Sequence, residues 1–329
     1  MLAAAAAAPR RLSTAAAPRI GFVGATGLMG HGMAKNLLLK AFPTTLYTRP
    51  ASKARARLTD LLALGAAEAR TPAALARASD VVILCVTGSP EVDETLYGAD
   101  GVIAGAREGL LVVDSSTSDV GASARARADL AARGARFVDA PLTRTPAAAE
   151  AGTANTMVGA EAADFARLEP VFRAYCEHVI HAGGPGKGLV LKLINNFVGQ
   201  AITTATAEGL TTAVKTGLDL RALHKLMSLG SVNNLMFQFM LGTMLEGGPA
   251  QLDGLKFSLA NAKKDLHNYT TLTASLRQPT PVADAVHGAL AQANALGLGD
   301  KFIASLVTAQ ERLHGVKIST LDDAPPPKK

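Results

Sequence analysis

The chain has 329 residues, enough for two domains with separate hydrophobic cores. It contains no run of 18 apolar residues free of breakers or charges, so we expect no membrane span. Half of the net charge of +6 lies in the first twenty residues, without interleaved aromatics, and we expect no nucleic-acid partner. Cys85 and Cys176 form neither a metal-ligand cluster nor a disulfide framework, so no metal site is predicted.

The first segment, residues 1–18, has the composition of a targeting leader. It reads MLAAAAAAPRRLSTAAAP, and the first acidic residue of the whole chain is Asp60. Such a composition is typical of a mitochondrial presequence and predicts a location in the mitochondrial matrix. A plastid leader, or a disordered leader on a cytoplasmic protein, are the alternatives. At the other end, residues 319–329 are rich in proline and charge, which predicts a disordered tail.

A glycine-rich turn follows the leader and separates an apolar run from a helical pattern. The run Ile20–Val23 predicts a strand, and the helical pattern starts at Met29. A turn of this kind lets the backbone approach the pyrophosphate of a dinucleotide, and the helix N-terminus supplies free N–H groups. The spacing is GxxGxxG, whereas GxGxxG is usual. We expect the cofactor to contact the turn residues Gly24, Ala25, Thr26, Gly27, Leu28, Met29 and Gly30.

Strand and helix patterns alternate from residue 19 to residue 182. Further strands are expected at Thr44–Thr48, Val81–Val86, Leu110–Asp114, Phe137–Asp139 and Thr156–Val158. This alternation predicts an α/β Rossmann domain with a doubly wound parallel sheet. From residue 183 to residue 318 the pattern is helical and begins with one long helix over Leu189–Val214. The chain is therefore predicted to join a dinucleotide-binding domain, through that helix, to an all-α domain for substrate binding and dimerisation.

The end of the second predicted strand bears on which nucleotide is bound. An acidic residue there usually holds the ribose hydroxyls of NAD, but this chain has Thr48 and Arg49, with no acid nearby in sequence. A guanidinium can pair bidentately with the 2′-phosphate of NADP. We therefore expect Thr48 and Arg49 to contact the cofactor, and NADP to be preferred over NAD. The basic residues Lys53, Arg55 and Arg57 are compatible with a solvated helix face.

A lysine in an apolar helical segment is the candidate for chemistry. Lys192 lies in GLVLKLINNF, and Asn196 follows one helical turn later on the same face. A lysine in such surroundings is costly to bury unless it has partners or a lowered pKa, and a lowered pKa suits general acid/base work. Taken by itself, the segment fits an exposed helix lysine equally well.

Four separated motifs together resemble the β-hydroxyacid dehydrogenase family, which includes 3-hydroxyisobutyrate dehydrogenases and glyoxylate/succinic semialdehyde reductases. The motifs are GFVGATGLMGHGMAKNL, then DSST from Asp114, then DAPLT from Asp139 followed by AAAEAGTANTMVGA, and GPGKGLVLKLINN. A further match is Lys264-Asp265-Leu266, with Phe257 seven residues before the lysine. The resemblance covers most of the chain, from about residue 19 to residue 317.

The resemblance implies roles for the matching residues. Lys192 takes the place of the catalytic lysine, and Asn196 that of its asparagine partner. Cofactor-contacting places fall to Val86, Thr87, Thr117, Phe257 and Lys264, and places that hold the substrate carboxylate fall to Ser116, Thr117 and Thr143. The implied reaction is hydride transfer between a nicotinamide cofactor and the carbinol carbon of a small β-hydroxyacid, or the reverse with its semialdehyde. Lys192 would give or take the hydroxyl proton.

The substrate loop departs from the family pattern. Where the family has Ser-Gly-Gly, this chain has Thr143-Arg144-Thr145. The arginine resembles the variant in sulfolactaldehyde reductases, where a Gly-Arg-Thr segment holds a sulfonate. A guanidinium is a fixed positive fork that suits such groups. Arg144 is therefore a candidate for binding the anionic end of the substrate, and a surface loop arginine is the alternative.

The leading hypothesis is an NAD(P)-dependent dehydrogenase or reductase of the 3-hydroxyisobutyrate dehydrogenase type. Glyoxylate/succinic semialdehyde and sulfolactaldehyde reduction are the alternatives within this class, and a non-catalytic nucleotide-binding module is the alternative outside it. The Lys192–Asn196 pair favours an enzyme over such a module. Apolar helices in the second domain also predict a homo-oligomer.

Overall fold

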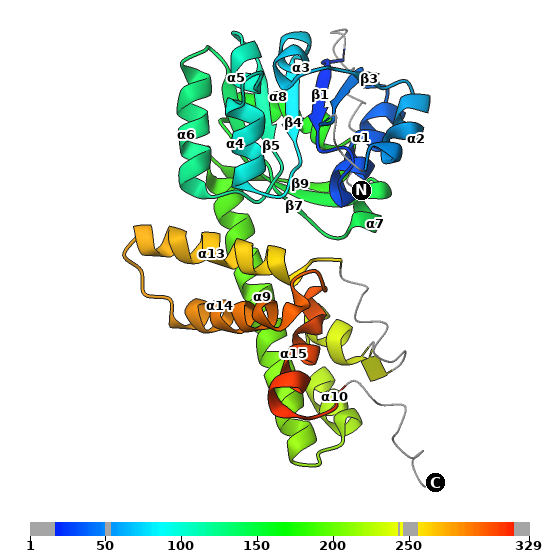
Figure 1. The fold of residues 1–329 in the computed structure, drawn as a ribbon, viewed down its shortest axis with the longest axis vertical. Helices are drawn as coiled ribbons and strands as arrows, with labels where there is room; N and C mark the ends of the chain where they lie inside the picture. Colours follow the sequence, from blue (N-terminus) through cyan, green and yellow to red (C-terminus); the bar gives the residue numbers. More distant parts are fainter. Residues whose placement is uncertain (1–16, 50–53, 243, 246–255, 319–329) are drawn as a thin grey trace, which may run out of the picture.

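The computed structural model describes residues 17–49, 54–242, 244–245 and 256–318, so most of the predicted leader and the whole predicted tail lie outside the described residues. Figure 1 shows two bodies: a sheet flanked by helices, and below it a group of helices. The helix α9 (Lys187–Lys215) leaves the first body and runs through the second. This arrangement confirms the expected class, a Rossmann-like α/β domain followed by a helical domain.

The sheet of the first domain is mainly parallel. Its strands, in chain order, are β1 (Ile20–Val23), β2 (Thr44–Tyr47), β3 (Ala67–Glu68), β4 (Val81–Leu84), β5 (Leu111–Asp114), β6 (Arg136–Asp139), β7 (Leu142–Thr143), β8 (Ala154–Gly159) and β9 (Cys176–Gly183). In the described residues they stand in the order β3-β2-β1-β4-β5-β6-β8-β7, and β9 pairs with β8. Strand β8 runs antiparallel to β6 and β7, so the expectation of a parallel sheet fails at this edge. The two-residue strands β3 and β7 are too short for a sequence pattern to predict.

The helices of the first domain cover both faces of the sheet (Figure 1). They are α1 (Leu28–Leu39), α2 (Thr59–Ala63), α3 (Pro72–Ala78), α4 (Ser89–Tyr97), α5 (Val102–Gly105), α6 (Val120–Ala131), α7 (Pro146–Glu150) and α8 (Ala162–Phe172). The described helices of the second domain after α9 are α10 (Leu220–Leu229), α11 (Leu235–Phe237), α13 (Leu259–Ser275), α14 (Pro281–Ala293) and α15 (Leu306–His314). Within the described segments, no helix is long and apolar enough to cross a membrane.

The central strands form because their side chains are apolar on both faces. All four residues of β1, β4 and β5 are buried. Phe22 and Ile83 belong to one hydrophobic cluster, while Val82, Leu84 and Val112 belong to the cluster on the other side. This alternation is what a strand buried between two helical layers requires. The strands β2 and β4 end earlier than expected, which leaves Thr48 and Val86 in the loops at the carboxyl edge of the sheet.

The start of α9 is fixed directly to the sheet. Asp139, at the end of β6, accepts hydrogen bonds from the backbone N–H of Gly186 at 2.6 Å and of Leu189 at 2.7 Å. A Cβ on Gly188 would lie 2.2 Å from the carbonyl oxygen of Met157, so only glycine fits where the helix packs on β8. The buried carboxylate therefore caps α9 and sets the position of the residues in its second turn.

A histidine in α1 joins three helices of the first domain. His31 Nδ1 lies 2.5 Å from Glu150 Oε1 at the end of α7, and its Nε2 lies 3.1 Å from Asp60 Oδ1 in α2. Burial lowers the pKa of His31, but the hydrogen bonds to Glu150 and Asp60 outweigh it, so the net shift of the pKa is upward. Asn36 adds hydrogen bonds from Nδ2 to the carbonyl oxygens of Ala149 and Glu150. These contacts hold α7, which follows the substrate loop, against the glycine-turn helix.

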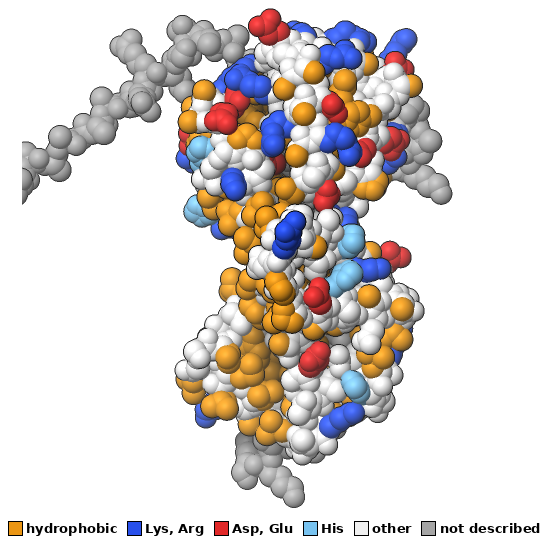
Figure 2. All heavy atoms as spheres, turned by 90° about the vertical axis from the view of Figure 1, so that its left-hand side faces the viewer, with side chains coloured by type: hydrophobic (Ala, Val, Ile, Leu, Met, Phe, Trp, Pro, Cys, Tyr) orange, Lys and Arg blue, Asp and Glu red, His pale blue; other side chains and the backbone are white. Residues whose placement is uncertain are grey.

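Hydrophobic side chains are exposed around the waist between the two domains (Figure 2). Leu191, Ile194 and Val198 of α9 are 37%, 44% and 49% exposed, and their spacing of three and four residues places them on one stripe of the helix. Ile180 of β9 is 47% exposed.

Candidate active site

The glycine turn after β1 is shaped so that side chains are impossible at two of its positions. Gly24 has φ +99°, and a Cβ there would lie 2.0 Å from the carbonyl oxygen of Cys85. A Cβ on Gly30 would lie 2.2 Å from the carbonyl oxygen of Gly24. Gly27 is the N-cap residue of α1, and no side chain caps the helix there. The turn therefore presents bare backbone and the positive end of a helix, as a pyrophosphate cradle requires.

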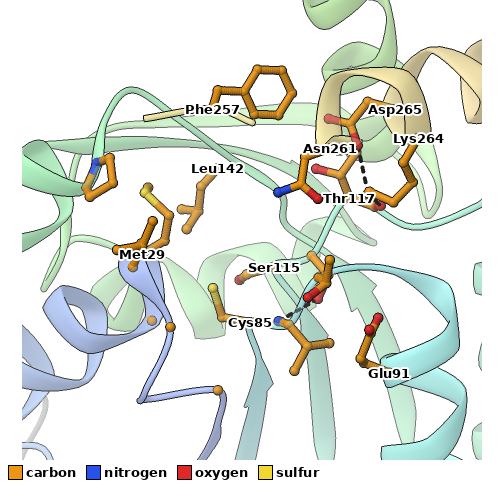
Figure 3. Close-up of a pocket in the computed structure, with 18 of the residues that line it drawn as sticks. Met29, Cys85, Glu91, Ser115, Thr117, Leu142, Phe257, Asn261, Lys264 and Asp265 are labelled. Atoms are coloured by element: carbon orange, nitrogen blue, oxygen red, sulfur yellow. Dashed lines mark hydrogen bonds and ion pairs between the residues drawn. The ribbon is translucent and has the colours of Figure 1, made fainter. Parts of the chain in front are cut away.

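A cavity of about 680 Å³ lies between the two domains above this turn. Figure 3 shows Met29, Cys85 and Ser115 of the first domain on one side and Phe257 and Asn261 of the second on the other. Every residue that the sequence assigned to cofactor or substrate lines the cavity except Ala25, whose side chain is fully buried. The structure thus brings residues from seven separate segments together, while their individual roles remain predictions.

Lys192 lies in the wall of the cavity contributed by α9. Burial lowers the pKa of its ammonium, and the positive charge of Lys264 lowers it further, whereas the carboxylate of Asp265 acts in the opposite direction. In the part of the chain that the structure describes, no hydrogen bond or ion pair holds Lys192 Nζ. Asn196, one turn later, donates from Nδ2 to Asp265 Oδ2 at 2.6 Å. The asparagine is therefore held in place, and the lysine ammonium is left to face the cavity.

Lys264 of α13 connects the two domains across the cavity (Figure 3). Its Nζ donates to the carbonyl oxygen of Thr117, in the loop after β5, at 2.6 Å. The same ammonium lies 2.7 Å from Asp265 Oδ1. Its aliphatic part packs on Gly88, where an added Cβ would lie 3.1 Å from Lys264 Cδ. Asp265 is 3% exposed, so its charge acts on both neighbouring lysines from inside the protein.

The loop after β5 is organised by a buried carboxylate. Asp114 accepts hydrogen bonds from the backbone N–H of Ser116 and from Ser118 Oγ, both at 2.8 Å. Burial raises the pKa of Asp114 to about 6. Ser116 Oγ accepts a hydrogen bond from the backbone N–H of Val86 at 3.0 Å. The carboxylate thus shapes the loop that places Ser116 in the wall of the cavity.

The predicted phosphate-binding arginine has an acidic partner. Arg49 Nη1 donates to Glu94 Oε2 of α4 at 2.9 Å, and both side chains are more than half exposed. The sequence interpretation found no acid near Arg49, and this is wrong in space, because α4 brings Glu94 across 45 positions of chain. Glu91 and Glu94 both line the cavity. The nucleotide end of the site therefore carries charges of both signs.

Arg144, the residue at which the substrate loop differs from the family pattern, also has an acidic partner. Arg144 Nη1 donates to Glu177 Oε2 at 2.5 Å and to the carbonyl oxygen of Thr153 at 2.7 Å. Its φ is +76°, a conformation that glycine adopts freely and other residues adopt at a cost. Arg144 thus keeps a glycine-like backbone in the loop. It lines the cavity, but its guanidinium is anchored at the rim.

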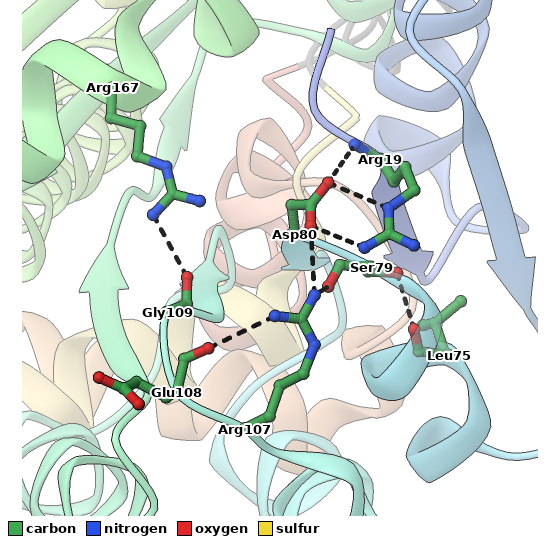
Figure 4. A network of polar contacts seen from close by, with 8 residues as sticks. All are labelled: Arg19, Leu75, Ser79, Asp80, Arg107, Glu108, Gly109 and Arg167. Carbon is green, nitrogen blue, oxygen red and sulfur yellow. Dashed lines mark hydrogen bonds and ion pairs between the residues drawn. The ribbon is translucent and has the colours of Figure 1, made fainter. Parts of the chain in front are cut away.

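At the amino ends of the strands, away from the cavity, ion pairs connect neighbouring loops (Figure 4). Asp80, just before β4, accepts hydrogen bonds from the backbone N–H and the guanidinium of Arg19 at 2.8–3.1 Å. Arg107 Nη2 donates to Asp80 Oδ1 at 3.2 Å and to the carbonyl oxygen of Ser79 at 2.7 Å. These arginines hold the pKa of Asp80 well below its usual range. The amino ends of the strands are thus fastened, and the cavity lies at the carboxyl ends, where ligands bind in such sheets.

Comparison with known proteins identifies the family. Residues 19–183 match the model described as the NAD binding domain of 6-phosphogluconate dehydrogenase. Residues 186–309 match the model described as NAD-binding of NADP-dependent 3-hydroxyisobutyrate dehydrogenase. The chain belongs to the 3-hydroxyisobutyrate dehydrogenase family. It is therefore an NAD(P)-dependent oxidoreductase of the hydroxyacid dehydrogenase class, as the sequence motifs predicted.

Individual members of the 3-hydroxyisobutyrate dehydrogenase family align over both domains. The 2-(hydroxymethyl)glutarate dehydrogenase of Eubacterium barkeri is 27% identical over 92% of this chain and 97% of its own. The 3-sulfolactaldehyde reductase of Escherichia coli is 30% identical over 85% of this chain and 91% of its own. The structure of Mycobacterium tuberculosis 3-hydroxyisobutyrate dehydrogenase with L-serine superposes with a TM-score of 0.79 at 26% identity, and covers 89% of this chain and 99% of that one.

Several cavity residues of this 3-hydroxyisobutyrate dehydrogenase family member were missed by the sequence interpretation. A role for Glu94 could have been predicted, because it lies in the helix that follows β4, a strand whose carboxyl end faces the cavity. Asp265 stood inside the quoted Lys-Asp-Leu segment but received no role. Gln200 and Asn261 line the cavity from α9 and α13. Gln200 lies one further turn beyond Asn196, so extending the spacing of four residues along the helix would have found it.

Proposed function

We propose that the chain is an NADP-preferring dehydrogenase or reductase that interconverts a small anionic β-hydroxyacid and its semialdehyde. Lys192 is the general acid/base and Asn196 its partner. The observation that carries this proposal is the contrast between the two: Asn196 is held by the buried Asp265, whereas Lys192 Nζ has no partner among the described residues and a pKa lowered by burial.

The chain's own residues divide the work between the two domains. The bare turn at Gly24–Gly30 and the N-terminus of α1 fit a pyrophosphate, and Thr117, Phe257 and Lys264 line the part of the cavity proposed for the nicotinamide. When bound, the nicotinamide supplies or accepts the hydride. Protonated Lys192 donates a proton to the carbonyl oxygen of a semialdehyde, and neutral Lys192 accepts the proton of a hydroxyl group. A lowered pKa makes both forms accessible closer to neutral pH.

The two ends of the cavity set the proposed specificity. At the nucleotide end, Thr48 and Arg49 favour the 2′-phosphate of NADP, with Arg49 exchanging Glu94 for the phosphate. At the substrate end, Ser116 and Thr143 receive the anionic group, together with Arg144 when its guanidinium exchanges Glu177 for that group. Oxidation of a 3-hydroxyisobutyrate-like acid is the leading reaction, and reduction of glyoxylate, succinic semialdehyde or sulfolactaldehyde is the alternative.

The test compares Lys192→Met with the purified wild-type chain and with Lys215→Met, a control at the exposed far end of the same helix. Methionine keeps the length of the side chain and removes only its proton-transferring group. We expect NADPH binding to persist in Lys192→Met while turnover falls by several orders of magnitude on every substrate of a panel of hydroxyacids and semialdehydes, each with both cofactors. Wild-type turnover in Lys192→Met refutes the mechanism.

Two further parts of the proposal concern the environment of the enzyme. The composition of residues 1–18 supports import into the mitochondrial matrix, which an import assay with isolated mitochondria tests. The exposed stripe Leu191, Ile194 and Val198, together with the apolar helices of the second domain, supports a homo-oligomer. Sedimentation of the full chain tests that assembly.

A further inference from the structure

The side chain of Gln200 is buried without a hydrogen-bond partner. The residue is 3% exposed and lines the cavity from α9. Neither its Nε2 nor its Oε1 has a partner among the described residues. A buried amide that loses its hydrogen bonds to water and gains none within the protein is destabilising. Unpaired groups of this kind therefore require an explanation. An incoming ligand that supplies both partners would remove this cost.

The surroundings of Gln200 leave room for such a ligand. Gly199, next to it in the same wall, would carry a Cβ with no heavy atom within 4 Å. Thr203 and Asn261 also line the cavity, and neither carries a charge. The terminal torsion of a glutamine is broad, so the carboxamide can reorient toward this space without a change in the helix.

The distance along α9 indicates which part of a substrate lies here. Lys192, Asn196 and Gln200 follow one another at intervals of four residues on one stripe. A rise of 1.5 Å per residue separates the first and the last by about 12 Å. A three-carbon hydroxyacid whose hydroxyl lies at Lys192 is shorter than this separation of the two backbone positions. A substrate group that pairs with Gln200 is therefore expected on a longer side chain, remote from the reacting carbon.

The chemistry of a carboxamide narrows the class of that group. Its NH₂ donates and its oxygen accepts, so both are satisfied by a hydroxyl or by another carboxamide. A carboxylate accepts only and leaves Oε1 unpaired, and an alkyl group leaves both atoms unpaired. We propose that Gln200 binds a hydroxyl or carboxamide group at the far end of the substrate, and so selects extended polar substrates over branched aliphatic ones. This inference rests on the proposed function, since it takes the substrate to be a hydroxyacid held at Lys192.

The test uses two probes that differ only at the remote end. One is the C5 monoamide of 2-(hydroxymethyl)glutarate, and the other is 2-(hydroxymethyl)-5-methylhexanoate, in which an isopropyl group replaces the carboxamide. The readout is the ratio of their kcat/KM values for oxidation with NADP⁺. We expect the wild-type chain to favour the amide at least tenfold, Gln200→Met to lose that preference, and Gln292→Met, an exposed control on α14, to keep it.

Each outcome decides between the two proposals. An equal rate on both probes in the wild-type chain overturns the role of Gln200, and so does an unchanged preference in Gln200→Met. If Gln200→Met fails to fold, as NADPH binding and the melting temperature report, the wild-type ratio alone decides. Oxidation of 3-hydroxyisobutyrate without a preference for the amide refutes only this inference. No oxidation of any hydroxyacid refutes the proposed function itself.

Discussion

The ion pair between Arg49 and Glu94 allows the nucleotide preference to be tested quantitatively. If Arg49 binds the 2′-phosphate, Arg49→Gln removes charge-assisted hydrogen bonds that contribute about 1.5–3 kcal/mol when well formed. The Arg49 side chain is 62% exposed, so solvent screening points to the lower end of that range. We expect the Kd for NADPH to rise roughly tenfold, which corresponds to about 1.4 kcal/mol, with little change for NADH.

Glu94 makes the same reasoning testable in the opposite direction. The 2.9 Å pair with Arg49 is exposed and contributes about 0–1 kcal/mol, and its charge also repels a phosphate. Glu94→Gln is therefore expected to tighten NADPH binding up to about fivefold, and by less in the Arg49→Gln background, where only the repulsion is removed. Nicotinamide fluorescence titrations at low and high ionic strength measure both effects. Arg125→Gln, which removes the similar exposed pair with Asp93, is the control. Equal losses for NADPH and NADH in Arg49→Gln refute the phosphate role.

Two further predictions concern the substrate loop and the α7 clamp. Arg144→Gly relieves the positive φ but loses the Glu177 ion pair, so we expect stability within about 1 kcal/mol of wild type and a KM for anionic substrates raised roughly tenfold. An unchanged KM leaves Arg144 a surface residue. His31 has a raised pKa, so its pairing stabilises the fold fully below about pH 6.5 and is lost as pH rises through the folded-state value. Urea unfolding should show His31→Gln losing stability at pH 5.5 and little at pH 8.5; a pH-independent difference contradicts this.

The sequence predicted the fold well where local pattern and burial agree. The fully apolar run at Val81–Val86 has no polar face, and β4 is buried on both sides. The edge of the sheet was harder to predict. Strand β7 is only two residues long, and β8 runs antiparallel to it, a direction that no local sequence pattern encodes. The long α9 was expected from its helical period, although its capping by Asp139 depends on a contact across 47 residues.

The site shows the same division between local and distant information. Motif positions such as Lys192 and Thr117 were found in the sequence, and they line one cavity. Their partners were not: Asp265 behind Asn196, and Glu94 and Glu177 beside the two arginines, come from elements far along the chain. An ion pair between residues far apart in the chain cannot be read from a single sequence. No acidic partner was therefore expected for Arg49 or Arg144, whereas in the structure each has one.

The contact between Lys264 and Thr117 links the spacing of the two domains to the bonding of one ammonium group. The helix α9 joins the two domains and is fixed to the sheet at its start, and the bond from Lys264 to Thr117 is a second connection between them across the cavity. A cofactor that takes over this ammonium exchanges an interdomain bond for a bond to itself. Affinity for the cofactor and the spacing between Lys192 and the substrate loop are then two expressions of one equilibrium.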